Sequence, residues 1–137
     1  MKVIVDTCVW SRFFRGALSS DDRTLAELRS LIREDSVQML GCIRQELLSG
    51  AQPQQRFYHI RDYLRHYPNL PVDEEDDENA AAYYNLCRSK GIQGGPADFL
   101  ICALAVRHRM AILTTDSDFD GFAQRLPILL HKGPWRR

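Results

Sequence analysis

The chain has 137 residues, of which 45% are apolar, and this is the size of one ordinary domain with one continuous core. Its 18 basic residues balance 18 acidic residues, so bulk charge does not indicate a nucleic-acid binder. Its four cysteines form no Cys-x-x-Cys pair, which leaves zinc knuckles and redox motifs without support. With no signal-peptide pattern and no run long enough to span a membrane, we expect one domain over residues 1–137, in the cytoplasm and away from membranes, with reduced thiols.

The first half of the chain alternates short apolar runs with amphipathic stretches. Residues 2–6 are a β-branched run, typical of a buried strand, and the aromatic residues of 54–67 share one helical stripe that ends before Pro68. Ser19, Ser20, Asp21 and Asp22 are all possible N-caps for the helix that follows them. The predicted elements are a strand over 2–6, a turn region, a helix over 19–34, a strand over 36–42, and helices over 43–50 and 54–67.

The second half continues the alternation. The acidic run over 73–78 leads into a helical pattern and is interpreted as a solvated helix start that would repel RNA. Residues 99–106 are apolar on every face, so their helix, entered through Gly94, Gly95 and Pro96, should be buried. The predicted elements are helices over 75–90 and over the buried segment, a strand over 111–115, a short helix over 118–125 and an edge strand over 126–131.

Strands that alternate with helices predict an α/β fold around a mostly parallel sheet. In such sheets, ligands bind beyond the carboxyl ends of the strands. Asp6 ends the first predicted strand and Asp116 follows a later one, so both lie at such ends. The sequence therefore predicts a shared site at this edge of the sheet.

Each acid also has a simpler structural interpretation. Asp6 suits an N-cap or Asx-turn, and Asp98 suits the first turn of the buried helix. Asp118 suits the cap of the last short helix about as well as it suits a ligand site. Glu46 lies in the helix over 43–50, expected to follow a central strand, where a glutamate is usually solvated. Phe119 and Phe122 are predicted to be core anchors.

Taken together, the acids predict more than each does alone. Carboxylates gathered within a few ångströms repel one another unless something neutralises them. Hard divalent cations such as Mg²⁺ accept oxygen ligands and can activate water for attack on phosphorus. Metal-dependent phosphodiester hydrolysis is the chemistry that fits this set of acids.

Four segments, in order, resemble the motifs of the PIN-domain ribonucleases and, within them, the VapC toxins of type II toxin–antitoxin systems. They are VIVDTCVW (3–10), IRQELLSG (43–50), ADFLICALAV (97–106) and AILTTDSDF (111–119), and the resemblance runs essentially end to end. Cys42 departs from the Pro or Thr that relatives often have near the start of the second segment, but the four acids are intact. The resemblance implies an α/β/α sandwich with a parallel sheet, RNA cleavage that depends on Mg²⁺ or Mn²⁺, homodimers, and a VapB-like antitoxin partner.

Carried over by position, the resemblance implies a role for each matching residue. Asp6, Glu46, Asp98 and Asp116 would be the metal-binding catalytic acids, with Asp118 as an accessory ligand. Thr114 would orient water at the site. The aromatic stripe over 57–67, otherwise core, would suit the dimer or antitoxin surface.

Beyond these motifs, the basic residues are weaker candidates. Arg12 and Arg15 follow the first acid and are possible contacts for RNA phosphates, as are the cations around Trp135, which could stack on a base. An alternative from another class is a degenerate PIN domain that binds RNA or protein without cutting, although all four acids are present. A haloacid-dehalogenase-type phosphatase is disfavoured, because it would have Asp-x-Asp after the first strand, where this chain has Asp6-Thr7-Cys8. A dinucleotide-binding enzyme is also disfavoured, because no Gly-x-Gly-x-x-Gly motif follows a strand.

Overall fold

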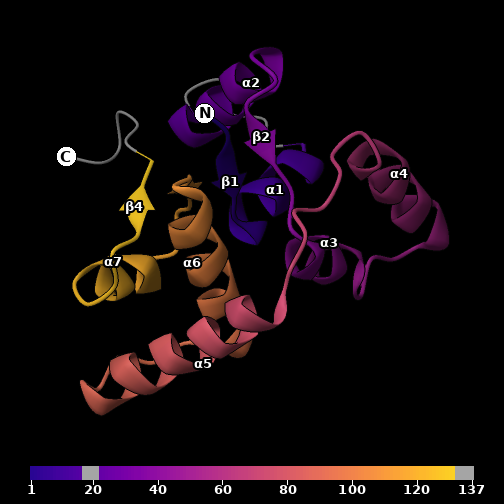
Figure 1. The fold of residues 1–137 in the computed structure, drawn as a ribbon. Helices are drawn as coiled ribbons and strands as arrows, with labels where there is room; N and C mark the ends of the chain where they lie inside the picture. The colour runs from indigo at the N-terminus through magenta and orange to yellow at the C-terminus, as the bar shows by residue number, and fades with distance from the viewer. Residues whose placement is uncertain (17–21, 132–137) are drawn as a thin grey trace.

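The computed structural model describes residues 1–16 and 22–131 and has the predicted α/β architecture (Figure 1). The first two helices follow the first strand, and α5 crosses the end of α6 in Figure 1. In chain order the elements are β1 (Val3–Val5), α1 (Thr7–Phe14), α2 (Arg23–Arg33), β2 (Val37–Gln38), α3 (Gly41–Leu48), α4 (Gln54–Leu64), α5 (Glu74–Ser89), α6 (Pro96–His108), β3 (Ala111–Leu113), α7 (Asp118–Ala123) and β4 (Leu129–Leu130).

The sheet has the order β2-β1-β3-β4, and every pair of neighbouring strands is parallel. This confirms the predicted parallel sheet and places β4 at an edge. The expectation that α3 follows a central strand is wrong, because β2 lies at the opposite edge. In the centre, β1 pairs with β3 so that Val5 lies beside Leu113. The residues that follow these two, Asp6 and Thr114, must therefore leave the sheet side by side.

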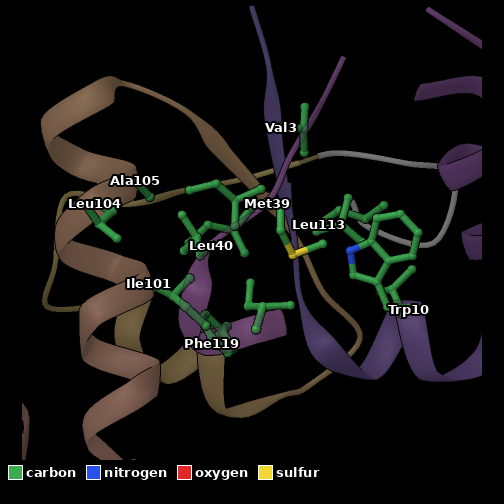
Figure 2. Close-up of a cluster of buried hydrophobic side chains, with 14 of the residues drawn as sticks. Val3, Trp10, Met39, Leu40, Ile101, Leu104, Ala105, Leu113 and Phe119 are labelled. Atoms are coloured by element: carbon green, nitrogen blue, oxygen red, sulfur yellow. The ribbon is translucent and has the colours of Figure 1, made fainter. Parts of the chain in front are cut away.

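The core lies on both faces of the sheet. Side chains along a strand alternate between faces, yet Val3, Ile4 and Val5 are all buried, so helices must cover both sides. Figure 2 shows residues of α6 packed near the strands, with Trp10 of α1 in the same cluster. Phe119 and Phe122 are fully buried, which confirms their predicted role as core anchors.

The turn region predicted after the first strand is wrong, because residues 7–14 form helix α1. The side chain of Asp6 caps this helix by accepting a hydrogen bond from the Thr7 amide at 2.8 Å. Val9 and Trp10 are buried on its inner face. The helix is therefore held by one cap and one apolar stripe, and its start fixes the direction of the Asp6 carboxylate.

Asp22, one of the four predicted caps, accepts a hydrogen bond from the Leu25 amide and begins α2. Ser19, Ser20, Asp21 and the tail that carries Trp135 lie outside the described residues. All four cysteines are free thiols. Within the described ranges, no helix has both the length and the apolar character needed to cross a membrane.

The acidic run over 73–78 is not wholly solvated, which corrects the interpretation from the sequence. Asp76 is fully buried and accepts two hydrogen bonds from the Arg107 guanidinium, at 2.6 and 2.7 Å. It also forms a reciprocal capping box with Asp73 at the start of α5. These bonds hold the pKa of Asp76 below its usual range and tie α5 to α6.

The loop before α6 leaves no room for a side chain at Gly94. A Cβ atom there would lie 2.5 Å from the ring of Phe122 and 3.0 Å from that of Phe99, and both rings are buried. At Gly121, inside α7, a Cβ would meet Ile92 at an ordinary 3.6 Å.

We expect Gly94→Ala to lower the free energy of unfolding by about 1–3 kcal/mol, because overpacking a filled core is destabilising. Gly121→Ala, the matched control, should raise it by up to about 1 kcal/mol, because alanine is the better helix former. Urea unfolding of both variants tests this. Equal stability of Gly94→Ala and the unmodified chain would mean that the loop can move away from Phe122.

Candidate active site

The centre of the candidate site is the contact between Asp6 and Thr114, at the carboxyl ends of β1 and β3. The Asp6 amide donates to the Leu113 carbonyl at 2.9 Å, which extends the strand pairing by one bond. The Thr114 hydroxyl then donates to Asp6 Oδ2 at 2.7 Å and accepts from the Asp116 amide at 3.0 Å. Asp6 is 6% exposed and Thr114 is fully buried, so both positions are fixed by the sheet.

Burial raises the pKa of Asp6 above its ordinary value, although hydrogen bonds from Thr114, Thr7 and Cys8 oppose the rise. The negative charge of Asp116 raises it further. Cys8 Sγ lies 3.5 Å from Asp6 Oδ2 and 3.5 Å from the Thr114 hydroxyl. Sequence reasoning missed this thiol, although Cys8 lies two residues after Asp6 and therefore in the first turn of the helix that Asp6 caps.

Glu46 approaches from α3. Its Oε2 accepts a hydrogen bond at 3.1 Å from the hydroxyl of Thr7, the residue next to Asp6. The carboxylate is otherwise exposed. Helix α3 thus directs Glu46 toward the carboxyl end of β1, even though β2, the strand before α3, lies at the edge of the sheet.

Asp98 approaches from the first turn of α6, where its Oδ2 accepts a hydrogen bond from the Gly95 amide at 3.0 Å. Burial raises its pKa, the bond from Gly95 lowers it, and the charges of Asp6, Asp116 and Glu46 raise it. The carboxylates of Asp6, Asp116 and Glu46 therefore lie close enough to Asp98 for their charges to act on it, although the four acids come from four separate segments of the chain.

Asp116, and not Asp118, caps the last short helix, α7. Asp116 Oδ1 accepts a hydrogen bond at 2.9 Å from the Asp118 amide, which is the first residue of α7. Asp116 therefore satisfies this end of the helix, and the capping interpretation of Asp118 is wrong. The Asp118 side chain instead lines a pocket of ≈ 400 Å³ together with Asp98, Tyr84 and Arg88.

The donor set suits a hard divalent cation. All four acids offer oxygen ligands, and among the described residues none of them forms an ion pair with Lys, Arg or His. Glu46, Asp98 and Asp116 each use one oxygen in a local hydrogen bond, which leaves the second oxygen of each without a hydrogen bond in the described part of the chain. In their present rotamers, however, no three His, Cys, Asp or Glu side chains of residues 1–16 and 22–131 are arranged as a metal site.

The arginines predicted to contact RNA differ in their surroundings. Arg12 forms an ion pair with Asp22, the cap of α2. Arg15 lines a pocket of ≈ 210 Å³ together with Glu46 and Arg56. Sequence reasoning missed Arg56, because nothing in the pattern of α4 indicates that its first turn lies beside Glu46. A larger pocket of ≈ 430 Å³ lies between α5 and α6 and contains none of the predicted site residues.

Fold and site define an α/β protein with a parallel sheet, at whose carboxyl end acidic residues have no ion-pair partner within residues 1–16 and 22–131. Residues 3–124 match the PIN domain, so the chain belongs to the PIN-domain family.

Named relatives and solved structures agree with this assignment. The chain is 33% identical over 126 residues to the VapC ribonuclease Mb1587 of Mycobacterium bovis and to the ribonuclease VapC11 of Mycobacterium tuberculosis, matching 89% of this chain and 92% of each relative. Its fold is similar to that of FitAcB from Neisseria gonorrhoeae, with a TM-score of 0.74 and 23% identity, covering 98% of this chain and 99% of that one. It is equally similar to VapBC2 from Rickettsia felis bound to a promoter DNA fragment, with a TM-score of 0.74 and 15% identity, covering 96% and 98%.

Mutual repulsion among the acids predicts a pH-dependent gain in stability when Asp98 is neutralised. Because its pKa is higher in the folded chain than in the unfolded chain, its stabilising contribution is complete in acid and is lost as pH rises through the folded value. Without added metal, Asp98→Asn should therefore raise the melting temperature more at about pH 7.5 than at about pH 4. Asparagine retains an acceptor for the Gly95 amide.

Thermal melts in EDTA at both pH values measure this effect. The exposed Asp118, changed to Asn, serves as the control and should show a smaller difference. A gain for Asp98→Asn that is the same at both pH values would contradict the repulsion.

Proposed function

We propose that this protein is a VapC-type endoribonuclease, the toxin of a type II toxin–antitoxin module, that hydrolyses RNA phosphodiesters with a divalent cation. Mg²⁺ is the expected ion and Mn²⁺ its substitute. The observation that carries the proposal is the convergence of Asp6, Glu46, Asp98 and Asp116 without a cationic partner among the described residues. Membership of the PIN-domain family and relatives named as VapC ribonucleases support it.

The chain's own residues would hold and orient the acids. Asp6, Glu46, Asp98 and Asp116 would be the ligands, with Asp118 accessory to them. When bound, the cation supplies activation of the attacking water and stabilises charge on the leaving oxygen. Thr114 and the Thr7 amide fix both oxygens of Asp6, and the Thr7 hydroxyl fixes one oxygen of Glu46. A water-orienting role for Thr114 remains part of the proposal beside this positioning role.

The partner expected at this site is a VapB-like antitoxin. The structural neighbours include toxin–antitoxin complexes, among them VapBC-1 from nontypeable Haemophilus influenzae, with a TM-score of 0.69. We further propose a homodimer in the cytoplasm. The surface expected to meet a second chain is on α4, where Phe57 of the aromatic stripe is half-buried and its neighbour Tyr58, outside the stripe, is exposed.

Loss of a single acid should abolish cleavage. We expect Asp6→Asn and Asp98→Asn each to reduce cleavage of purified RNA by at least about a hundredfold, because each removes stabilisation of charge in the transition state. Asp62→Asn, on the outer surface of α4, should cleave normally.

Induced expression of the same variants gives the cellular result. Growth arrest with discrete new RNA 5′ ends is expected for the unmodified chain and Asp62→Asn only. Normal growth and intact RNA with folded unmodified chain, free of antitoxin, would favour the non-catalytic binding domain instead.

Cation binding should stabilise the fold, because a ligand that binds only the native state raises the melting temperature. Millimolar Mn²⁺ is expected to raise the melting temperature of the unmodified chain, and to raise that of an Asp6→Asn, Asp98→Asn double variant much less. An equal rise in both would place the bound ion elsewhere, and no rise with or without RNA would remove the cation from the mechanism.

A further inference from the structure

A small pocket opens beside the acids, where α1, α3 and the start of α4 meet. Its volume is ≈ 210 Å³. Glu46 forms part of its wall and also contacts Thr7, the neighbour of Asp6, so the pocket begins where the group of acids ends. The pocket is also lined by Arg15, at the end of α1, and by Arg56, in the first turn of α4.

These two arginines lack partners in the described part of the chain. Neither guanidinium has a hydrogen bond or ion pair with residues 1–16 or 22–131. Several other arginines have carboxylate or carbonyl partners, namely Arg12, Arg44, Arg61 and Arg107. Arg56 also lies at the positive end of the α4 dipole, where a cation is unfavourable, and Pro53 before it provides no side-chain cap. An anion in the pocket would offset both charges.

The pocket lined by Asp98 and Asp118 has the opposite balance of charge. It contains Asp98 and Asp118 but only one arginine, Arg88, whose guanidinium already donates to the Tyr84 hydroxyl at 3.1 Å. A phosphate would meet net repulsion there and net attraction beside Arg15 and Arg56. The two pockets therefore differ in the charge of the ligand that they can bind.

We propose that the pocket of Arg15 and Arg56 is a phosphate subsite, which binds the RNA backbone next to the phosphodiester that is cut. A guanidinium group can donate two parallel hydrogen bonds to two oxygens of one phosphate, and Ser11 adds a hydroxyl to the lining of the pocket. Phe14 provides an apolar surface for the adjoining sugar. This proposal rests on the proposed function for the identity of its substrate. Because the chain has no net charge, binding of RNA requires a local group of positive charges, and Arg15 and Arg56 would supply it.

The test measures binding apart from cleavage. The parent chain carries Asp6→Asn and Asp98→Asn, which removes two repelling charges and prevents cleavage, and a fluorescent single-stranded RNA is titrated in EDTA over a salt series. Adding Arg15→Gln and Arg56→Gln should weaken binding by about tenfold or more at low salt. It should also reduce the slope of log affinity against log salt by about 1.4, since each phosphate contact to a single strand contributes about 0.7.

Two further variants control for charge and folding. Arg29→Gln with Arg33→Gln removes two exposed charges from α2 and should leave affinity within about twofold of the parent and the slope unchanged. Arg15→Lys with Arg56→Lys should recover the slope but not the full affinity, because lysine keeps the charge and loses the paired geometry. Thermal melts establish that each variant is folded.

The outcomes separate the subsite from the proposed function. Unchanged RNA affinity and slope after the two Gln substitutions would overturn the subsite, and so would a parent that binds no RNA at low salt. Loss of binding to a glutamate-rich peptide, with RNA binding intact, would assign the pocket to a protein partner and overturn the proposal. RNA cleavage by the unmodified chain is assayed separately, so its failure would count against the nuclease and not against the pocket.

Discussion

The parallel pairing of β1 with β3 is the constraint on which the site depends. It brings together two segments that are more than a hundred residues apart, with Val5 beside Leu113 and the hydroxyl of Thr114 bonded to Asp6. One residue beyond the last strand pair, the backbone of Asp6 still bonds to Leu113, so the carboxylate begins from a rigid edge. Asp116 follows within two residues, bonded through its amide to the same threonine.

The protein treats two buried aspartates in opposite ways. Asp76 is paired with Arg107, its pKa is lowered, and the pair joins two helices. Asp6 is nearly as buried but has no cationic partner among the described residues, and its pKa is raised. A buried carboxylate without compensation destabilises the fold, so the sheet that holds Asp6 must supply the stability that the site lacks. This difference between two residues of one type marks the site more clearly than either pKa alone.

The strands and the acids could be predicted from the sequence because both are local signals. A β-branched run that ends on an aspartate predicts a strand with that aspartate at its carboxyl end, and this prediction does not depend on the rest of the fold. The sequence offers Asp6 as an N-cap but does not predict helix α1 after it, because the eight residues of this helix are rich in β-branched and aromatic side chains, which are weak helix formers. The burial of Asp76 and the nearness of Arg56 to Glu46 depend on how helices far apart in the chain pack together. No spacing rule within one element contains that information.

The same dependence on packing bears on how a chain without net charge would bind RNA under the proposed function. Four carboxylates at the carboxyl end of the sheet would repel RNA in every direction. Dissolved salt screens that repulsion beyond roughly 10 Å. Cations therefore need to be close to the acids to offset that repulsion, and Arg15 and Arg56 share a pocket with Glu46. Since Asp6 is the N-cap of α1 and Arg15 its C-cap, one short helix connects the carboxylate of the site with an arginine of the proposed phosphate subsite.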